Sequence, residues 1–375
     1  MTEEWTKEFN PFNSNKLYAQ VYRWREIEGD SPLPAPALVT IDPTNVCNSD
    51  CVWCNSKYIR DKNHNEISPE VLKQIAGFLP NFSDNERYRG VEAVCIAGGG
   101  EPLLNDYTPS LVRDLTSNGI GVGIVTNGTM MTQPELTESD WIGVSVDAGT
   151  PQTYRELKRR DDFNLVRRNI SEMARMSEGT TLGKEGQGHG ISYKFLLHPR
   201  NCGDVYEAAR IAKETGCRNL HIRPYGTPWD KVKLGGHPFS FDDIDVFQEQ
   251  LIKARELEDE TFGVFGVTHK FDGRLRKRNE FGKCNAVLMT GVFEPPTTDG
   301  KGFNFGLCCD RRGDKKLTLE DLTEVEAVKD FWGSPTHRAV VDEIDVKSCP
   351  RCTYQPHNKI FEKVIQEDNT TYEFI

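Results

Sequence analysis

Short apolar runs alternate with amphipathic helical patterns through the first two thirds of the chain. The apolar runs that predict buried strands are 37–42, 91–97, 121–126, 141–147, 191–198 and 219–224. The helical patterns between them begin at Ser68, near 108, near 163 and near Gly203. This alternation is typical of parallel βα units. Six repeats are too few for a full eight-stranded barrel, so we expect an α/β fold, a partial (β/α)6 TIM-like barrel followed by a small α+β domain.

The pattern changes after residue 225. Segment 177–190 reads as a polar, glycine-rich loop, and 226–240 as a Pro/Gly-rich linker. A further helix is expected from Ser240 to about Leu257, with Asp243 completing a capping box, and a strand over 262–271. The predicted division is an N-terminal extension (1–35), a partial barrel (36–225), a linker and helix (226–260) and a C-terminal domain (261–375).

Composition and charge exclude several classes of protein. Forty-six Lys and Arg against 57 Asp and Glu leave a net charge of −11, which argues against a broad basic face for nucleic acid. No apolar run approaches the length of a membrane span, and the first residues, MTEEWTKEFN, carry no secretory signal. We therefore expect a cytoplasmic protein that binds neither nucleic acid nor membrane.

The 11 cysteines point to metal ligation rather than to disulfides, because the chain shows no signal for an oxidising compartment. Cys47, Cys51 and Cys54 follow the first predicted strand in the order C-x3-C-x2-C. Three thiolates suit a four-iron cluster with one open iron, whereas four would close a structural zinc site. A zinc knuckle, or three unrelated thiols, remains the alternative on spacing alone.

Two motifs together resemble the radical S-adenosylmethionine (SAM) superfamily. The first is TNVCNSDCVWC around Cys47, and the second is the run Gly98-Gly99-Gly100-Glu101, which closes the next predicted strand. The resemblance implies that the three cysteines hold a four-iron cluster and that SAM chelates its fourth iron. It also implies that Trp53 lies near the adenine and that Gly98–Glu101 binds the amino group of SAM.

Weaker matches follow at later strand ends. Asn127 closes the third strand, Ser145 and Asp147 close the fourth, and Lys194 lies on the fifth. The resemblance implies that these residues contact the ribose or carboxylate of SAM. The alternative for each is a polar residue that satisfies local backbone groups.

A second group of cysteines lies in the last quarter of the chain. A structural zinc site is a serious alternative here. The arrangement resembles the twitch subdomain, a shorter relative of the SPASM extension, which implies one auxiliary four-iron cluster with four cysteine ligands. We expect these to be Cys284, Cys308, Cys349 and Cys352, with Cys309 as the alternate to Cys308. The remaining residues, Cys95, Cys202 and Cys217, read as small buried side chains.

The resemblance also implies the chemistry. SAM would be cleaved reductively to a 5′-deoxyadenosyl radical that takes a hydrogen atom from the substrate, with flavodoxin or ferredoxin as external electron donor. A fully ligated auxiliary cluster favours a net oxidation, with a residue that removes a proton. Arg223 and Asp310 are weak candidates for the catalytic residue, as are His198, Tyr225 and Arg311, although a salt bridge is the simpler role for each.

The substrate class is expected to be a small polyol, sugar or aminocyclitol. Modification of a peptide or protein side chain is the alternative, although the 46 residues before Cys47 are expected to be too few for a separate peptide-recognition domain. Redox-neutral epimerisation, with Cys95, Cys202 or Cys217 as hydrogen donor, and a non-enzymatic zinc scaffold are further alternatives.

Overall fold

The computed structural model describes residues 15–185, 189–225, 239–266, 281–298, 301–349 and 352–367. Its strands are β1 (Leu38–Ile41), β2 (Ala93–Ile96), β3 (Gly121–Thr126), β4 (Trp141–Ser145), β5 (Gly190–Leu197), β6 (Asn219–Pro224), β7 (Gly263–Gly266), β8 (Thr290–Glu294), β9 (Phe303–Gly306) and β10 (Thr318–Leu322). Its α-helices are α1 (Asn15–Tyr18), α2 (Val21–Arg25), α3 (Lys57–Arg60), α4 (Pro69–Phe78), α5 (Thr108–Ser117), α6 (Pro151–Lys158), α7 (Phe163–Met176), α8 (Val205–Glu214), α9 (Phe241–Arg255), α10 (Glu326–Phe331), α11 (Pro335–Glu343) and α12 (Gln355–Ile360).

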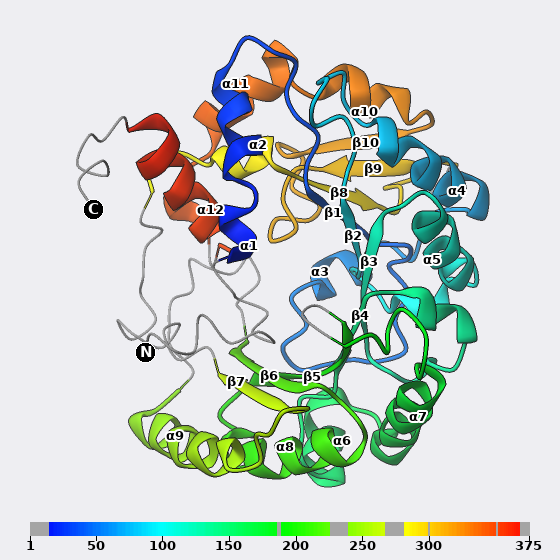
Figure 1. Cartoon of the computed structure of the whole chain (residues 1–375), viewed down its shortest axis with the longest axis vertical. Helices are drawn as coiled ribbons and strands as arrows, with labels where there is room; N and C mark the ends of the chain where they lie inside the picture. Colours follow the sequence, from blue (N-terminus) through cyan, green and yellow to red (C-terminus); the bar gives the residue numbers. More distant parts are fainter. Residues whose placement is uncertain are drawn as a thin grey trace.

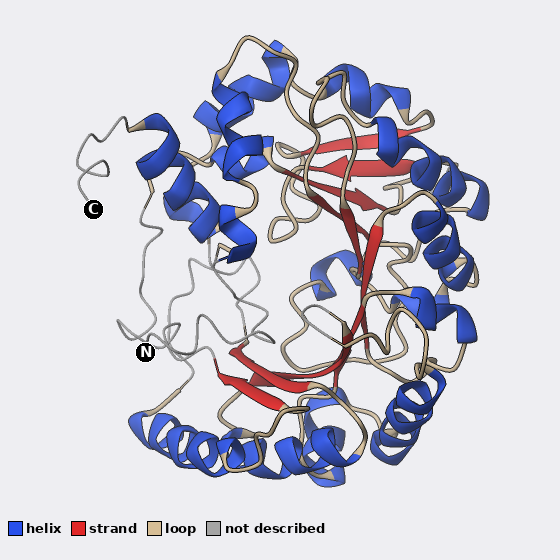
Figure 2. Ribbon diagram, viewed as in Figure 1, coloured by secondary structure: helices blue, strands red, loops and turns tan. Residues whose placement is uncertain are grey.

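All described strands belong to one curved sheet, in the order β10-β9-β8-β1-β2-β3-β4-β5-β6-β7. Pairing is parallel from β8 through β1 to β7, and antiparallel between β8, β9 and β10. Helices α4 to α9 cover the outer, convex side of this arc (Figures 1 and 2). The predicted α/β fold with a partial barrel is confirmed, and the six predicted barrel strands match β1 to β6 to within two residues at each end.

Helix starts follow local capping chemistry. The Ser68 side chain accepts the Val71 N–H before α4, and Pro69 occupies the first turn. Ser240 and Asp243 form the predicted capping box at the start of α9. Helix α6 was not expected from the sequence, although Thr150 accepts the Thr153 N–H ahead of Pro151 in the same way.

The two faces of the sheet differ in chemistry. On β1 and β2 the side chains of Val39, Ile41, Val94 and Ile96 are buried in the core under the helices. The alternate positions face inward, as the strand period of two requires. Thr40 pairs with Cys95 there, and Cys95 pairs with Gly123. The inner face of the barrel is therefore the face on which polar residues gather.

The C-terminal part does not form a separate sheet. Strand β7 pairs with β6 at one barrel edge, while β8 pairs with β1 at the other. Most of the predicted linker 226–240, and the end of the strand predicted over 262–271, lie outside the described residues. The domain ranges stay a prediction, but the sheet is continuous across the boundary placed between them.

The N-terminal segment packs on the C-terminal helices (Figure 1). The Trp332 indole donates to the Pro34 carbonyl at 3.0 Å, and Arg338 donates to the Ile27 carbonyl at 3.1 Å. These bonds tie the segment before β1 to the region that carries the second cysteine group. No helix in the described part of the chain is long and apolar enough to cross a membrane.

Candidate active site and auxiliary cysteine site

The first three cysteines lie on the loop between β1 and α3, and all three are half-buried. The Arg60 guanidinium, one turn further along, donates to Cys54 Sγ at 3.4 Å and to the Ser49 carbonyl at 2.7 Å. Arg60 thus places a positive charge beside this sulfur. Sequence reasoning missed Arg60, because a single arginine on a short helix carries no signal of its own.

The glycine run packs against the start of this loop. The Gly100 N–H donates to the Thr44 carbonyl at 3.0 Å, and the Glu101 N–H donates to the Val46 carbonyl at 2.8 Å. A Cβ at Gly100 would lie 2.1 Å from the Val46 carbonyl oxygen, whereas one at Gly98 would meet nothing closer than 3.4 Å. Glycine is therefore needed at 100 for close backbone packing, and only Gly98 keeps space beside it.

Glu101 is almost fully buried, and its carboxylate receives three hydrogen bonds. The donors are the Thr126 hydroxyl at 2.6 Å, the Asn127 N–H at 2.7 Å and the Leu103 N–H at 3.2 Å. Burial raises the pKa of Glu101, and these bonds act against that rise. The side chain thus connects the ends of β2 and β3, and its predicted role toward the SAM amino group stays a prediction.

Asn127 and Asp147 lie at neighbouring strand ends, and Asn127 contacts the loop directly. The Asn127 amide donates to Asn48 Oδ1 at 2.7 Å. Asp147, fully buried and at φ 61, forms an ion pair with Lys158 and accepts the Leu196 N–H at 2.7 Å. Both carboxylate oxygens of Asp147 are occupied in this way, so its predicted contact with SAM stays a prediction.

Lys158 brings a second buried cation to the first cysteine group. It is 3% exposed on α6, and its charge acts to lower the pKa of Cys51, which burial raises. The Val52 N–H donates to the Leu157 carbonyl at 3.0 Å, so α6 directly abuts the loop. Lys158 is a further site residue that sequence reasoning missed, since its helix was not predicted.

The other predicted SAM contacts lie on the inner face of β4 and β5. Ser145 and Lys194 are partners in the strand register. The Lys194 ammonium lies 5.1 Å from the centre of the Trp141 ring. Their assignment to SAM stays a prediction.

Trp53 belongs to an aromatic group at the carboxyl ends of β5 and β6. Its ring centre lies 5.5 Å from that of His198 and 6.5 Å from that of Tyr225, and the last two are 5.0 Å apart. Burial lowers the pKa of His198, so its ring is neutral at physiological pH. The rings are tilted by 35° to 40° to one another, and partly exposed aromatic faces beside the cysteine loop suit stacking of a planar base.

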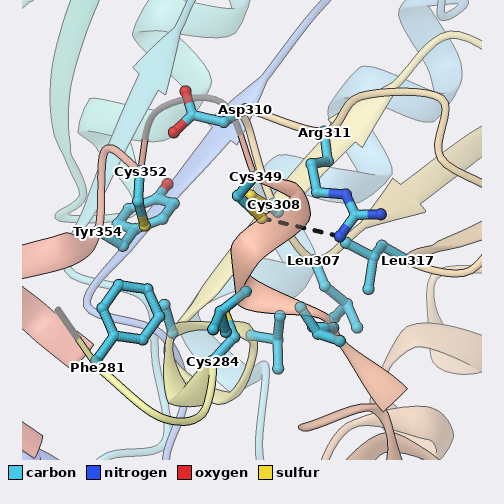
Figure 3. A pocket seen from close by; sticks show the side chains of 14 residues that line it. Phe281, Cys284, Leu307, Cys308, Asp310, Arg311, Leu317, Cys349, Cys352 and Tyr354 are labelled. Atoms are coloured by element: carbon cyan, nitrogen blue, oxygen red, sulfur yellow. Dashed lines mark hydrogen bonds between the residues drawn. The ribbon is translucent and has the colours of Figure 1, made fainter. Parts of the chain in front are cut away.

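The second cysteine group surrounds one cavity, seen in Figure 3. Cys284, Cys308, Cys349 and Cys352 all line it, and they come from three segments of the C-terminal part, because Cys349 and Cys352 are only three residues apart. Cys309 is not among the lining residues. Its thiol hydrogen-bonds with Tyr354, and its carbonyl accepts from Arg312. The structure thus brings together the predicted set with Cys308, although the ligand assignment stays a prediction.

Polar side chains reach the sulfur atoms of this group. The Asn358 amide, fully buried on α12, lies 4.0 Å from both Cys284 Sγ and Cys352 Sγ, and its oxygen accepts the Ala286 N–H at 2.8 Å. Arg311 lies 3.9 Å from Cys349 Sγ (Figure 3). Asn358 was missed by sequence reasoning, since nothing local distinguishes it from an ordinary helix residue.

The two groups differ from a single-metal site. Among the described residues, no three His, Cys, Asp or Glu side chains converge on one ion. Tetrahedral zinc would draw its sulfurs to about 3.8 Å from one another. Four cysteines around one cavity match the ligand number of a four-iron cluster, and three cysteines on one loop match a cluster with one open iron.

The weak catalytic candidates occupy different places. Arg223 lies on β6, where its charge reaches Cys95 on the inner face. Asp310 accepts the Thr353 N–H at 2.6 Å and the Thr353 hydroxyl at 2.9 Å, and so holds the turn after Cys352. Arg311 pairs with Asp314 at 2.5 Å. These contacts give Asp310 and Arg311 local structural roles.

Comparison with known families places these motifs in context. The model of the radical SAM superfamily matches residues 41–183. A probable GTP 3′,8-cyclase of Methanothermobacter marburgensis is 30% identical over 194 residues, which cover 49% of this chain and 61% of that protein. The mycofactocin maturase MftC of Mycobacterium tuberculosis is 27% identical over 233 residues, which cover 60% of this chain and 54% of that protein. The chain spans little more than half the length of these relatives.

Two solved structures share the fold. Streptococcus suis SuiB bound to precursor peptide SuiA gives a TM-score of 0.58 at 14% identity, covering 95% of this chain and 77% of that one. The structure of anSMEcpe with bound AdoMet gives a TM-score of 0.55 at 14% identity, and the match covers 91% of this chain and 100% of that one. The family match implies SAM and a four-iron cluster, which the three-cysteine loop fits. Residues 41–183 of this chain are a radical SAM domain.

Proposed function

We propose that this chain is a radical SAM enzyme that oxidises a polar substrate by two electrons. The observation that carries the proposal is the convergence of Cys284, Cys308, Cys349 and Cys352 on one cavity. Four cysteine ligands leave no open position for a substrate, so an auxiliary cluster held there would serve electron transfer. A redox-neutral reaction would leave no electron on the substrate for such a cluster to accept.

The residues of the chain divide the work between binding and orientation. Cys47, Cys51 and Cys54 would hold the cluster that SAM completes, and with it supply a 5′-deoxyadenosyl radical for hydrogen abstraction. Arg60 and Lys158 provide positive charge beside these thiolates. Trp53, with its aromatic neighbours, provides a stacking surface. An external one-electron donor of the flavodoxin or ferredoxin type would supply the reducing electron.

The polarity of the inner face supports a small polyol, sugar or aminocyclitol as substrate. Charges from Asp42, Lys194, Arg223 and Arg312 all reach Cys95, at the inner face of β2. Groups of both signs on one concave face suit a ligand with several hydroxyl or amino groups. A long apolar substrate would gain no polar contact from these groups.

Modification of a peptide is the second candidate function. The relative MftC is a mycofactocin maturase, and SuiB is a structural neighbour that was solved with its precursor peptide SuiA bound. The likeness to SuiB supports the fold only, and MftC matches over about half its length. We therefore rank peptide modification second, after oxidation of a small molecule.

Anaerobic reconstitution tests the proposal first. We expect about eight irons per chain and formation of 5′-deoxyadenosine under a strong reductant. A panel of inositols, amino sugars and aldoses should then yield a product two hydrogens lighter, whereas short peptides should not. If only about four irons were found and SAM were still cleaved, the chain would hold no auxiliary cluster, and the argument for a net oxidation would fail. Zinc without SAM cleavage would overturn the enzymatic proposal altogether.

A further inference from the structure

Glu294, at the end of β8, has a carboxylate oxygen that is buried without a partner. The residue is 6% exposed, and Oε1 has no hydrogen bond among the described residues. The carboxylate does accept the Gly313 N–H. An unpaired oxygen on a buried carboxylate is costly and calls for an explanation.

A second unpaired polar atom lies close by. Thr318 Oγ1, on β10, is also buried without a hydrogen bond in the described part of the chain. Both atoms lie near Gly306, which is on β9, the strand between β8 and β10. A Cβ built there would lie 2.7 Å from Glu294 Oε1 and 3.7 Å from Thr318 Oγ1. Two strands thus direct unsatisfied oxygens toward the same glycine, and a hydroxyl or amine group is the kind of partner that both lack.

The strand register places this spot on the inner face of the barrel. Gly306 pairs with Val292 and with Thr318, and Val292 pairs with Thr40, the inward partner of Cys95. The Asp42 N–H donates to the Phe293 carbonyl at 2.8 Å, which brings the end of β1 beside Glu294. Since ligands of such barrels bind at the carboxyl ends of the strands, Glu294 lies where a substrate would be held.

Glu294 also interacts with charged residues that lead into both cysteine regions. Asp42 leads directly into the first cysteine loop, and Arg312 follows Cys309 in the second region. Arg312 forms a two-pronged ion pair with Asp42, and its own carbonyl accepts the Tyr58 hydroxyl at 2.6 Å. Because Arg312 already balances Asp42, it leaves Glu294 without a full counter-ion. Burial and the nearby Asp42 charge raise the pKa of Glu294 to about 8, against the opposing charge of Arg312.

We propose that Glu294 and Thr318 bind the hydroxyl or amine group at the reacting carbon of the substrate, and that the Glu294 carboxylate accepts its proton. The inference rests on the proposed oxidation and adds the residue that this oxidation needs. Homolysis of the C–H bond leaves a carbon radical. Transfer of the O–H or N–H proton to Glu294, and of one electron to an acceptor of the iron–sulfur class, leaves a C=O or C=N bond.

Glu294 fits this role better than Asp310. Both oxygens of Asp310 are occupied by Thr353. A proton acceptor is most effective when its pKa lies near the working pH, and the pKa of Glu294 does so because of its burial.

Infrared difference spectroscopy tests the site without any substrate. We expect the reconstituted wild type at about pH 6 to show a protonated carboxyl band that Glu294→Gln lacks and that disappears by about pH 9. Glu324→Gln, at an exposed glutamate, is the matched control and should keep the band. An identical carboxyl region in Glu294→Gln and wild type would mean that Glu294 stays ionised down to about pH 6 and is too weak a base for the transfer, which would overturn the proposal.

A substrate deuterated at the reacting carbon tests the proton transfer. Once the wild type oxidises a member of the polyol and amino sugar panel, Glu294→Gln should lower the ratio of oxidised product to deuterated 5′-deoxyadenosine by at least about 100-fold. Thr318→Val, which keeps the shape of the side chain, should raise KM more than it lowers kcat. An unchanged ratio in Glu294→Gln would refute its role while leaving the oxidation intact. If the wild type gives no oxidised product from the panel, the proposed function itself fails.

Discussion

The two cysteine sites are built in opposite ways. The first takes its three thiols from eight consecutive residues, Cys47 to Cys54, on a single loop. The second takes four thiols from segments spread between Cys284 and Cys352, and a cavity forms only where these segments meet. The first site is thus specified by local spacing and the second by long-range packing. The difference teaches that a motif can identify the first but can only suggest the second.

Their charged surroundings differ as well. Arg60 donates to Cys54, and the Lys158 charge reaches Cys51, so two cations support the first group. In the second group Arg311 approaches Cys349, but the Asp310 charge acts with burial to raise the pKa of Cys308. The first group is thus approached by a lysine and an arginine, and the second by one arginine beside an aspartate.

The largest effect should come from removing one ligand at each site. Cys51→Ala should lose about four irons and more than about 100-fold of SAM cleavage. Cys349→Ala should lose a similar amount of iron but retain SAM cleavage, because its sulfur belongs to the other site. Cys217→Ala, at a buried thiol outside both groups, is the control for both measurements. Equal loss of SAM cleavage in the first two variants would show that the sites are not separable.

Backbone crowding at the first site gives the next effect. Gly100→Ala would place a Cβ 2.1 Å from the Val46 carbonyl, so we expect a lower iron content and a free energy of unfolding reduced by about 1–3 kcal/mol. Gly98→Ala meets its nearest atom at 3.4 Å and should fold normally. Denaturant unfolding of both variants measures the contrast, and equal stability would contradict the packing argument.

The choice between adjacent cysteines sharpens the comparison at the second site. Cys308→Ala removes a thiol that lines the cavity, so the auxiliary irons should be lost. Cys309→Ala removes a thiol that faces Tyr354 instead, and those irons should remain. Iron analysis and electron paramagnetic resonance distinguish the two. Loss of iron from Cys309→Ala alone would reverse the assignment.

A subtler effect is expected from Asn358. Asn358→Asp keeps an oxygen for the Ala286 N–H but removes the amide group that lies 4.0 Å from Cys284 Sγ and Cys352 Sγ. Since N–H groups near the sulfurs raise the potential of a cluster and negative charge lowers it, the auxiliary potential should fall. A redox titration monitored by electron paramagnetic resonance measures the potential of the auxiliary cluster. The potential of the first cluster, which Asn358 does not approach, provides the internal control.

The smallest effect is a pH dependence confined to the second region. Burial lowers the pKa of His337 to about 4, and its ring bonds with the Gly333 N–H and the Val287 carbonyl. Its stabilising contribution is therefore present above the ordinary histidine pKa of about 6.5 and is lost as pH falls toward 4, by at most about 1.4 kcal/mol per pH unit. Hydrogen exchange between about pH 7 and pH 5 should show loosening around Val287 first.

Two variants check the origin of that loosening. His337→Gln should remove part of the pH dependence, because the amide does not take up a proton in this range. His64→Gln, at an exposed histidine after the first cysteine loop, should leave it unchanged. Loosening that persists unaltered in His337→Gln would assign the effect to another group, of which His357, with its pKa also lowered by burial, is the nearest in kind.

Features that depend on neighbours in sequence could be predicted from the sequence. The strands β1 to β6, the Ser68 and Ser240 caps and the first cysteine loop all follow from periodicity or spacing within a few residues. The glycine run could be recognised, but the reason that Gly100 must be glycine could not. That reason is the approach of the Val46 carbonyl, from a segment more than 50 residues earlier.

What only the tertiary structure decided is which distant residues meet. The sequence by itself determined a βα barrel and a three-cysteine loop, because hydrophobic periodicity and local spacing are carried by consecutive residues. The structure alone placed Cys308 rather than Cys309 at the cavity, Lys158 beside Cys51 and Glu294 beside Asp42. These meetings depend on the order and register in which strands pair, and no stretch of a few residues encodes that register.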